Sequence, residues 1–404
     1  MNQGLNTIAA LCVAASALTA HVTLARDASP QWQETLDAAK GQTVYFNAWG
    51  GGDNINAYIR WAGDELKARY DIELSHVKVT DTANVVSRIL AEKSAGRDVD
   101  GSVDLVWVNG ENFRSLKQND LLFGPFSEQL PNLALTDTTS VTLTNDFSTP
   151  VEGYESPWGG AQLTFYYDSR RVEMAPNSAE KLLEFAQQNP GLFSYPALPD
   201  FHGTTFVKQI LSETISDQSL LASAADPELF LEQTEALWDY LDQLHPLMWR
   251  EGASFPSNIG QVMQLVDDSE LAIGFTFNPN DAAAAVLQGQ LPSSVRSYVH
   301  EAGTIGNTHF VAIPYNSSAK QAAMVTANFL LSPEAQARKA NIEYWGDPSV
   351  LDSSKLSSEQ QSLFQANKLE SLLPADQLGN TRQEPHVSWV ELIEAQWRER
   401  YLSQ

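Results

Sequence analysis

The sequence predicts an α/β protein built from two lobes. Strand patterns alternate with amphipathic helix patterns over residues 44–117, which is typical of a parallel sheet with helices packed against it. A stretch rich in Thr, Ser, Asn and Pro, from about 131 to 150, then interrupts this alternation and indicates a boundary between lobes. The length of 404 residues is sufficient for two such units, each with its own core.

The predicted first sheet comes from three strands separated by helices. Residues 44–49 have the pattern of a buried strand, and 72–79 and 103–108 supply two more strands. Apolar side chains recur at helical spacing over 54–70 and again over 82–95. A strand–helix–strand–helix–strand order predicts parallel neighbours joined by right-handed crossovers.

Glycine loops follow two of these strands. The first strand ends in Trp49-Gly50-Gly51-Gly52, and the third ends in Asn109-Gly110-Glu111-Asn112. Without a Cβ, glycine lets the backbone approach a ligand closely, and open α/β sheets bind small molecules where strands end beside helix N-termini. An ordinary turn with a helix cap explains the same residues equally well, so each loop alone leaves both interpretations open.

The second half of the chain contains further loops of this kind. Each one lies next to a predicted strand or helix and combines small residues with polar or aromatic side chains. They contain Trp158, Gly159, Gly160 and Gln162, then Thr204 and Thr205, then Asn278, and finally Trp345 and Asp347. Such loops suit a bound polar group, whereas helix capping by Thr and packing of buried Trp explain them without any ligand.

The charge of the chain narrows the range of partners. There are 50 acidic and 25 basic residues, for a formal net charge of -25. This charge argues against nucleic acid or an anionic membrane surface as a partner and fits a soluble secreted protein. Apolar residues make up 43% of the chain and charged residues 19%, which is a globular composition.

Residues 1–25 resemble a secretory signal peptide. They contain no Asp, Glu, Lys or Arg, are mostly apolar from 8 to 24, and end in the small-residue pattern Thr23-Leu24-Ala25. The absence of a basic residue near Met1 departs from the usual pattern. Cys12 is the only cysteine and lies inside this segment, so the mature chain is predicted to lack disulfides and thiolate sites. The protein is expected to be exported.

No catalytic or metal-binding constellation is visible in the sequence. It contains no Gly-x-Ser-x-Gly elbow, no phosphate loop and no His-Glu-x-x-His pair, and its histidines are scattered. Tyr166 and Tyr167 are adjacent within a strand pattern, which directs their side chains to opposite faces and argues against a shared ferric ion. We therefore predict no cofactor, no metal and no enzymatic activity.

An alternative function is that of a secreted carbohydrate-active hydrolase. That chemistry requires two carboxyl groups facing each other across a cleft at a defined separation. The candidate acids are Asp53, Glu111, Glu155 and Asp347, and nothing in the sequence pairs them.

Four long motifs and one helical motif carry a family resemblance. Residues 44–51 (VYFNAWGG), 101–114 (GSVDLVWVNGENFR), 155–165 and 345–352 (WGDPSVLD) resemble the YnjB-type family of solute-binding proteins. Residues 329–336 (FLLSPEAQ) are similar to a late helix–turn–helix of the wider periplasmic class that serves ABC importers and includes thiamine, polyamine and ferric-iron binders.

The resemblance implies a type II periplasmic binding protein. Each lobe is expected to be a mainly parallel sheet flanked by helices, with crossing strands as the hinge and a small solute held in the cleft. Residues 26–158 plus 309–340 would form lobe 1, and 159–308 plus 341–404 would form lobe 2. The implied partners are an ABC permease and its ATPase, and the protein is expected to be a periplasmic monomer that does not bind nucleic acid.

The same resemblance directs the glycine loops of both lobes toward one cleft. The residues then expected to contact the solute are Trp49, Gly50, Gly51, Asn109, Glu111, Asn112, Trp158, Gly159, Gly160, Gln162, Thr204, Thr205, Asn278, Trp345 and Asp347. The tryptophans suit stacking on a ring or a cation, and the amides and carboxylates suit orienting hydrogen bonds. The resemblance does not identify the solute.

Overall fold

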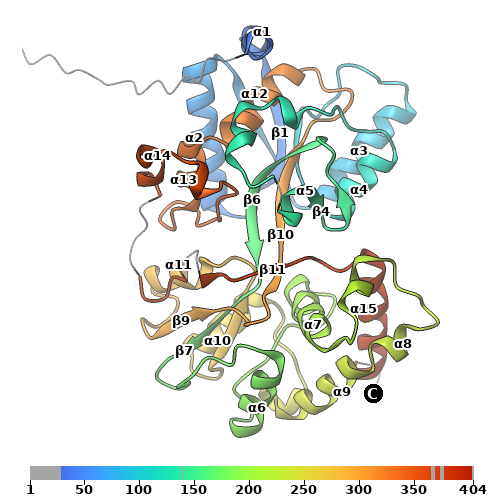
Figure 1. Ribbon diagram of the computed structural model, residues 1–404, viewed down its shortest axis with the longest axis vertical. Coiled ribbons are helices and arrows are strands. Elements are labelled where there is room, and N and C mark those ends of the chain that lie inside the picture. The colour runs from blue at the N-terminus through green and yellow to red at the C-terminus, as the bar shows by residue number, and fades with distance from the viewer. Residues whose placement is uncertain (1–28, 139, 365–368, 374–376, 403–404) are drawn as a thin grey trace, which may run out of the picture.

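The computed structural model describes residues 29–138, 140–364, 369–373 and 377–402. The predicted signal peptide lies outside these ranges. The chain forms two α/β bodies, one above the other in Figure 1, with strands β6 (Glu155–Gln162) and β10 (Thr304–Ala312) running side by side between them. The predicted two-lobe α/β class is therefore confirmed. Within the described ranges, no helix has the length and apolar composition needed to cross a membrane.

The first lobe is organised around a six-stranded mixed sheet. The strand order is β11-β10-β3-β1-β2, with β6 paired to β10. Strand β1 is parallel to β2 and β3, as the sequence predicts, whereas β10 is antiparallel to both β3 and β6. The remaining strands of this sheet are β1 (Thr43–Trp49), β2 (Glu73–Val79), β3 (Leu105–Val108) and β11 (Thr381–Arg382). Strand β11 pairs with Thr304 and Ile305, at the end of β10 that packs in the second-lobe core, so β11 lies on the second-lobe side.

Two hydrophobic cores cover the two faces of this sheet. Val44 and Phe46 of β1 belong to the larger core, and Val106 and Val108 of β3 belong to the smaller one. The larger core also takes side chains from α1 (Pro30–Ala39), α2 (Asp53–Tyr70), α12 (Lys320–Leu330) and α13 (Pro333–Ala340). The smaller core takes them from α3 (Thr82–Ser94) and α4 (Glu111–Gln118). Helix α5 (Val141–Thr144) and the hairpin β4 (Asn145–Asp146) and β5 (Thr149–Pro150) complete this lobe.

The second lobe has a three-stranded sheet in which β7 (Thr164–Asp168) lies between β8 (Ile273–Thr276) and β9 (Val295–Tyr298). Both neighbours pair antiparallel to β7, so the expectation of a mainly parallel sheet is corrected for this lobe. Strands β8 and β9 run in the same direction as each other, with α11 (Asp281–Leu287) between them in the chain. Strand β7 enters between them from the opposite direction because it continues directly from the crossing strand β6.

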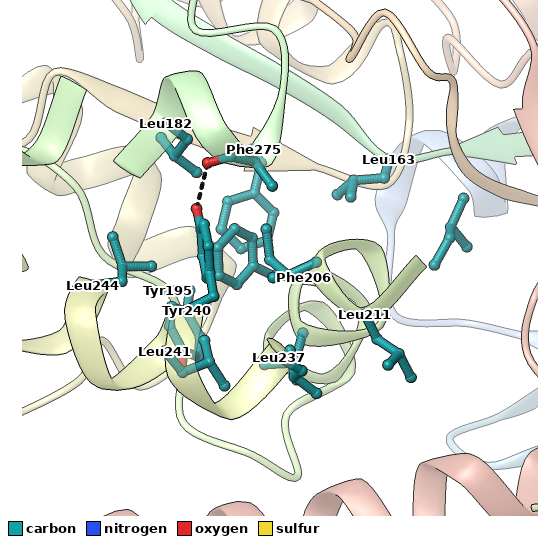
Figure 2. Close-up of a cluster of buried hydrophobic side chains, with 14 of the residues drawn as sticks. Leu163, Leu182, Tyr195, Phe206, Leu211, Leu237, Tyr240, Leu241, Leu244 and Phe275 are labelled. Carbon is teal, nitrogen blue, oxygen red and sulfur yellow. Dashed lines mark hydrogen bonds between the residues drawn. The ribbon is translucent and has the colours of Figure 1, made fainter. Parts of the chain in front are cut away.

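The core of the second lobe is rich in aromatic residues. Figure 2 shows Tyr195, Phe206 and Phe275 packed among leucines, with the Tyr240 hydroxyl donating a hydrogen bond of 2.8 Å to the Ala179 carbonyl. Most of the lobe's helices contribute to this cluster or border it. They are α6 (Ala179–Gln188), α7 (Phe201–Thr214), α8 (Phe230–Gln233), α9 (Glu235–Leu244), α10 (Ile259–Asp267) and α15 (Val387–Tyr401), while the short helix α14 (Ser358–Ser362) precedes the last crossing.

Packing revises one part of the expected lobe boundaries. Trp345 and Val350 belong to the larger core of the first lobe, although residues from 341 onward were expected in the second. The reason is helix α13, whose buried side chains Gln336 and Lys339 hydrogen-bond to the segment that follows it. Along β10, Ile305 packs in the second-lobe core and Val311 in the first. The other boundaries remain predictions.

Two buried acids lie in the first lobe near the crossing strands. Neither carboxylate oxygen of Glu155 has a hydrogen-bond partner, and Asp146 accepts one bond of 2.7 Å from the Gly110 N–H. Burial raises the pKa of Asp146 to about 7, opposed by the Gly110 N–H and assisted by repulsion from Glu384. Burial, together with repulsion from Asp146, raises the pKa of Glu155 well above its usual range. Both acids therefore hold a proton more tightly in the folded chain than in the unfolded chain.

This difference predicts that stability falls as the pH rises. The stabilisation from the protonated acids is complete below about pH 4, near the pKa values of the unfolded chain. It is lost as the pH rises through the folded pKa of Asp146, about 7. We expect Glu155→Gln to raise the melting temperature at pH 8 by about 1–2 °C for each kcal/mol regained, because the entropy of unfolding grows with chain length. Thermal unfolding at pH 5 and pH 8 measures the effect, with the exposed Glu34→Gln as control. Equal pH dependence in the parent and in Glu155→Gln would contradict this account.

Candidate functional site

A cavity of about 420 Å³ lies where the two lobes meet. Its first-lobe walls come from Asp137, Ser140, Thr142 and Leu143 and from residues 348–353, and its floor comes from 160–162 of β6 and 307–308 of β10. Pro279, Leu378 and Thr381 line the side toward the second lobe. This volume is within the usual range for a small-molecule site, and the position between two bodies is a common one.

The lining combines polar and apolar groups, and its charged side chains are all acidic. Asp137 and Asp352 are the charged side chains on it, and no Lys, Arg or His is among the described residues that line the cavity. Amide and hydroxyl groups dominate the rest of the polar surface, notably those of Gln162, Asn307 and Thr308. The cavity therefore suits a neutral or cationic polar molecule better than an anion, because nothing on the lining offsets a negative charge.

Two of the sequence-predicted site residues line this cavity. The Gly160 N–H donates a hydrogen bond of 3.1 Å to the Pro348 carbonyl, which joins the floor to the first-lobe wall. The Gln162 side chain is buried, and its Nε2 donates to the Thr304 Oγ1 at 3.0 Å and to the Leu378 carbonyl at 2.9 Å. These hydrogen bonds set the positions of both residues in the floor for this arrangement of the lobes.

Four more predicted residues form a packed layer next to the floor. Trp158 is fully buried and lies edge-on to Trp107, with ring centroids 4.6 Å apart, and to Trp345 at 5.4 Å. Gly159 and Asp347 complete the layer, and none of these residues is on the cavity lining. In this arrangement the tryptophans pack against one another, which is the alternative to ligand contact that the sequence left open.

A cluster of buried charges occupies this layer. The Asp347 carboxylate contacts the Lys339 ammonium and lies 3.0 Å from the His309 Nε2, and Lys339 also donates to the Pro348 carbonyl at 2.9 Å. Burial acts to raise the pKa of Asp347, but the charges of His309 and Lys339 outweigh it and hold the pKa below its usual range. The carboxylate thus keeps its charge inside the protein through its partners.

Gly159 makes room for this cluster. A Cβ at that position would lie 2.0 Å from the Asp347 Oδ2 and 2.2 Å from the His309 Nε2. Gly159 pairs with His309 across the β6–β10 ladder, where the register shifts between His309 and Phe310. The glycine is therefore explained by the close approach of the ion pair to the strand.

The predicted residues at the ends of β1 and β3 lie outside the cavity lining. Trp49 is 44% exposed, and its ring covers Gly51, where a Cβ would lie 2.3 Å from a ring carbon. The Gly50 carbonyl accepts a hydrogen bond of 3.0 Å from Asn56. Glu111 pairs with Arg114 at 3.5 Å in the first turn of α4. Asn109 and Asn112 flank the same turn, both half-buried.

Three predicted residues of the second lobe make local structural bonds. The Thr204 hydroxyl donates to the Glu394 carboxylate of α15 at 2.8 Å, and the Thr205 hydroxyl donates to the Phe201 carbonyl at 2.8 Å. Asn278 accepts a bond of 2.9 Å from the Asn280 N–H. None of the three lines the cavity, although Pro279, which follows Asn278, does.

Sequence reasoning missed most of the cavity walls. The residues that it did not select include Asn307 and Thr308 of β10, the segment 348–353, and Asp137, Ser140, Thr142 and Leu143. One available signal was the Asn307-Thr308 pair, since two polar residues inside a fully buried strand require partners. A second was the position of 348–353 directly after the Trp345-Gly346-Asp347 turn.

The four acids considered for hydrolysis do not meet in the cavity. Asp53 is the first residue of α2 and Glu111 the first of α4, while Glu155 and Asp347 are buried. None of the four is on the cavity lining.

A metal site is likewise absent from the residues that the structure describes. No group of three His, Cys, Asp or Glu side chains there is placed to hold a metal ion. Tyr166 belongs to one second-lobe cluster and Tyr167 packs against another, which agrees with the prediction that they point to opposite faces.

The charge cluster gives a sharp mutational prediction. Gly159→Ala forces a methyl group onto both Asp347 and His309, so we expect a loss of about 3–5 kcal/mol in the free energy of unfolding, as when a buried ion pair is broken. Gly160→Ala is the matched control, because its Cβ would meet only the Pro348 Cβ, at 3.6 Å. Denaturant unfolding of both variants measures the difference. Similar losses in the two variants would show that the cluster does not depend on Gly159.

Comparison with known proteins gives an independent assignment. Residues 61–368 match the family described as bacterial extracellular solute-binding protein. Protein YnjB of Escherichia coli (strain K12) is 47% identical over 370 residues, which cover 92% of this chain and 94% of YnjB.

Solved structures agree on the fold. An extracellular solute-binding protein from Bordetella parapertussis has a TM-score of 0.66 at 14% identity, covering 89% of this chain and 99% of its own. The spermidine/putrescine ABC transporter substrate-binding protein PotD of Streptococcus pneumoniae has a TM-score of 0.60 at 16% identity, covering 88% and 99%. Iron-bound HitA of Pseudomonas aeruginosa has a TM-score of 0.58 at 15% identity, covering 88% and 99%. Together with the family match and the identity to YnjB, the two-lobe fold and its cavity place this chain in the family of bacterial extracellular solute-binding proteins.

Proposed function

We propose that this chain, a solute-binding component of an ABC transporter, captures a small polar solute between its lobes and delivers it to a membrane permease. The observation that carries the proposal is the cavity, which takes walls from both lobes and its floor from the strands that cross between them. Solute contacts on both walls stabilise a closed arrangement over an open one, so that binding drives closure. The protein acts without catalysis, because its candidate acids do not converge on the cavity.

Gly160 and Gln162 are the predicted residues that we place in direct contact with the solute. Asn307, Thr308 and Asp352 extend this set to the rest of the lining. The other predicted residues fall into three groups in our proposal, the first of which is Thr204, Thr205 and Asn278, which make hydrogen bonds within the second lobe. Trp158, Gly159, Trp345 and Asp347 support the floor, whereas Trp49, Gly50, Gly51, Asn109, Glu111 and Asn112 lie at the first-lobe edge, where a larger solute extends to reach them.

The cellular setting follows from the same assignment. We propose that residues 1–25 direct export to the periplasm, where the mature chain acts as a monomer and docks on a permease driven by an ATPase. The support is the extracellular solute-binding family and the apolar, uncharged leader of the sequence.

The solute is best sought among neutral and cationic polar compounds. Structural neighbours include proteins described as spermidine/putrescine transporters, a GABA receptor and a protein bound to fructose-6-phosphate. These compounds differ in charge and therefore make a useful panel. Because the lining carries Asp137 and Asp352 and no described cation, we expect putrescine-like cations or neutral polyols to be preferred over fructose 6-phosphate.

Thermal shift against this panel tests the proposal. A solute at 100 times its Kd stabilises the folded chain by about 2.7 kcal/mol, which raises the melting temperature by several degrees. Mass spectrometry of compounds that co-purify with the protein from its native host supplies further candidates. Stabilisation without turnover supports a receptor. Release of product from a glycoside would instead establish the hydrolase, and the absence of any shift across the panel and the co-purified compounds would leave only a structural role.

Charge removal at the lining tests the predicted preference. For a cationic solute we expect Asp352→Asn to weaken binding by about two- to fivefold, the size of an exposed charge pair. Asp217→Asn is a matched control outside the cavity lining, because Asp217 and Asp352 each accept hydrogen bonds from the N–H and hydroxyl of a serine two residues later. Titration calorimetry at low salt measures both variants. An unchanged Kd for Asp352→Asn would show that this acid does not contribute to charge selection.

A further inference from the structure

Two side-chain amides of the second lobe donate hydrogen bonds to backbone carbonyls of the first lobe. The Asn280 Nδ2 lies 2.7 Å from the Gly346 carbonyl oxygen, and the Gln383 Nε2 lies 2.7 Å from the Phe147 carbonyl oxygen. Asn280 precedes α11 and follows a strand of the second-lobe sheet, whereas Gly346 follows Trp345 of the first-lobe core. Gln383 directly follows β11, and Phe147 lies in the β4–β5 turn.

Asn280 has a conformation that is unusual for its position. It is the N-cap residue of α11, where an Asn side chain ordinarily accepts a hydrogen bond from the first turn of its own helix. Here the side chain makes no such bond, and its amide points across to the other lobe. The backbone N–H of Asn280 is bound by the Asn278 side chain at 2.9 Å, which fixes the turn from which the amide extends.

The acceptor at Gly346 is equally well fixed. The Gly346 N–H donates to the carbonyls of Lys339 and Asn341 at 3.0 and 3.1 Å, and its φ of +88° is one that glycine adopts readily. The carbonyl that faces Asn280 is therefore held by the end of α13. A first-lobe element that is already rigid presents one acceptor toward the second lobe.

The second bond has a comparable construction. Phe147 adopts a φ of +51°, in the left-handed region that a bulky residue rarely enters, and its ring packs against Gly110. On the other side, the guanidinium of Arg382 anchors the strand before Gln383 through the carbonyls of Ser212 and Ala302, both at 2.8 Å. This bond is exposed, whereas the Asn280 bond is partly buried.

Both bonds lie close in the chain to residues that line the cavity. Pro279, next to Asn280, and Pro348, two residues after Gly346, both line it. Thr381, two residues before Gln383, also lines it. In Figure 1, α11 and α13 lie on one side of the crossing strands and α5 and β4 on the other.

We propose that Asn280 and Gln383 are a pair of latches that hold the lobes closed over the cavity. The role of these two residues in retaining a solute rests on the proposed function, whereas their role in holding the lobes together does not. Each bond forms only when the lobes approach, and a hydrogen bond of ordinary strength changes a two-state ratio by about three- to tenfold. The partly buried Asn280 latch is the stronger of the two, because water competes less for its groups.

Inter-lobe distances in the absence of solute test the latches. Spin labels at Lys40→Cys and Glu235→Cys, both exposed and one in each lobe, report closure by pulsed electron resonance, with Cys12→Ser removing the only native cysteine. We expect Asn280→Ala to shift the open-to-closed ratio toward open by about three- to tenfold, and Gln383→Ala by less. For a solute that binds only the closed state, the apparent Kd rises as the population of the closed state falls. The increase is at most the same three- to tenfold factor.

Matched controls separate a latch from a general loss of stability. Asn119→Ala and Gln243→Ala each remove a side-chain amide that donates to a carbonyl within its own helix region, at 2.8 and 3.0 Å. Asn280→Asp keeps a good N-cap residue for α11 but removes the donor, so it is expected to open the lobes while leaving the melting temperature near that of the parent. Distance distributions of both Asn280 variants that match those of the parent and the controls would overturn the proposal. Failure of every solute to bind would count against the proposed function and leave this result standing.

Discussion

The ion pair between Lys339 and Asp347 is the interaction on which the architecture around the cavity depends. Moving two charges out of water is costly, and such a pair persists only where its geometry is tight and its remaining hydrogen-bonding groups are satisfied. Here His309 and the Pro348 carbonyl supply the further partners, and Gly159 supplies the space. As a result, two crossing strands and the turn after Trp345 are all fixed to one helix, α13.

The same helix ties down the cavity wall through a second buried side chain. Gln336 lies one turn before Lys339, donates to the Trp158 carbonyl at 2.8 Å and accepts from the Val350 N–H at 3.1 Å. The wall at 348–353 and the crossing strand β6 thus share two anchors on α13. Since these anchors belong to the first lobe, we expect the wall to move with that lobe when the lobes move relative to each other.

Features of the fold and of the site that depend on neighbouring residues could be predicted from the sequence, and features that depend on distant residues could not. The order of strands and helices over 44–117 was predictable, because the spacing of apolar residues and the glycines at the ends of strands can be read from a short stretch of sequence. The pairing of β7 between β8 and β9 was not, because it depends on where the crossing strand enters the second sheet. Gly160 and Gln162 were found in a glycine turn, whereas Lys339 has the sequence pattern of a solvated helix residue. Its burial depends on Asp347, which lies beyond the end of the helix.

The position of the bulge connects the proposed closure to the floor of the cavity. Between the pairs Phe310–Pro157 and His309–Gly159, strand β6 carries one extra residue, Trp158, whose ring is locked in the first-lobe core. On the first-lobe side of this bulge the two strands are held by the charge cluster and by tryptophan packing. On the other side, 160–162 and 304–308 have neither constraint, and they lead directly into the second-lobe sheet. We therefore expect bending between the lobes to be concentrated in the residues that form the floor, so that a solute resting there contacts the part of the chain that changes shape when the lobes close.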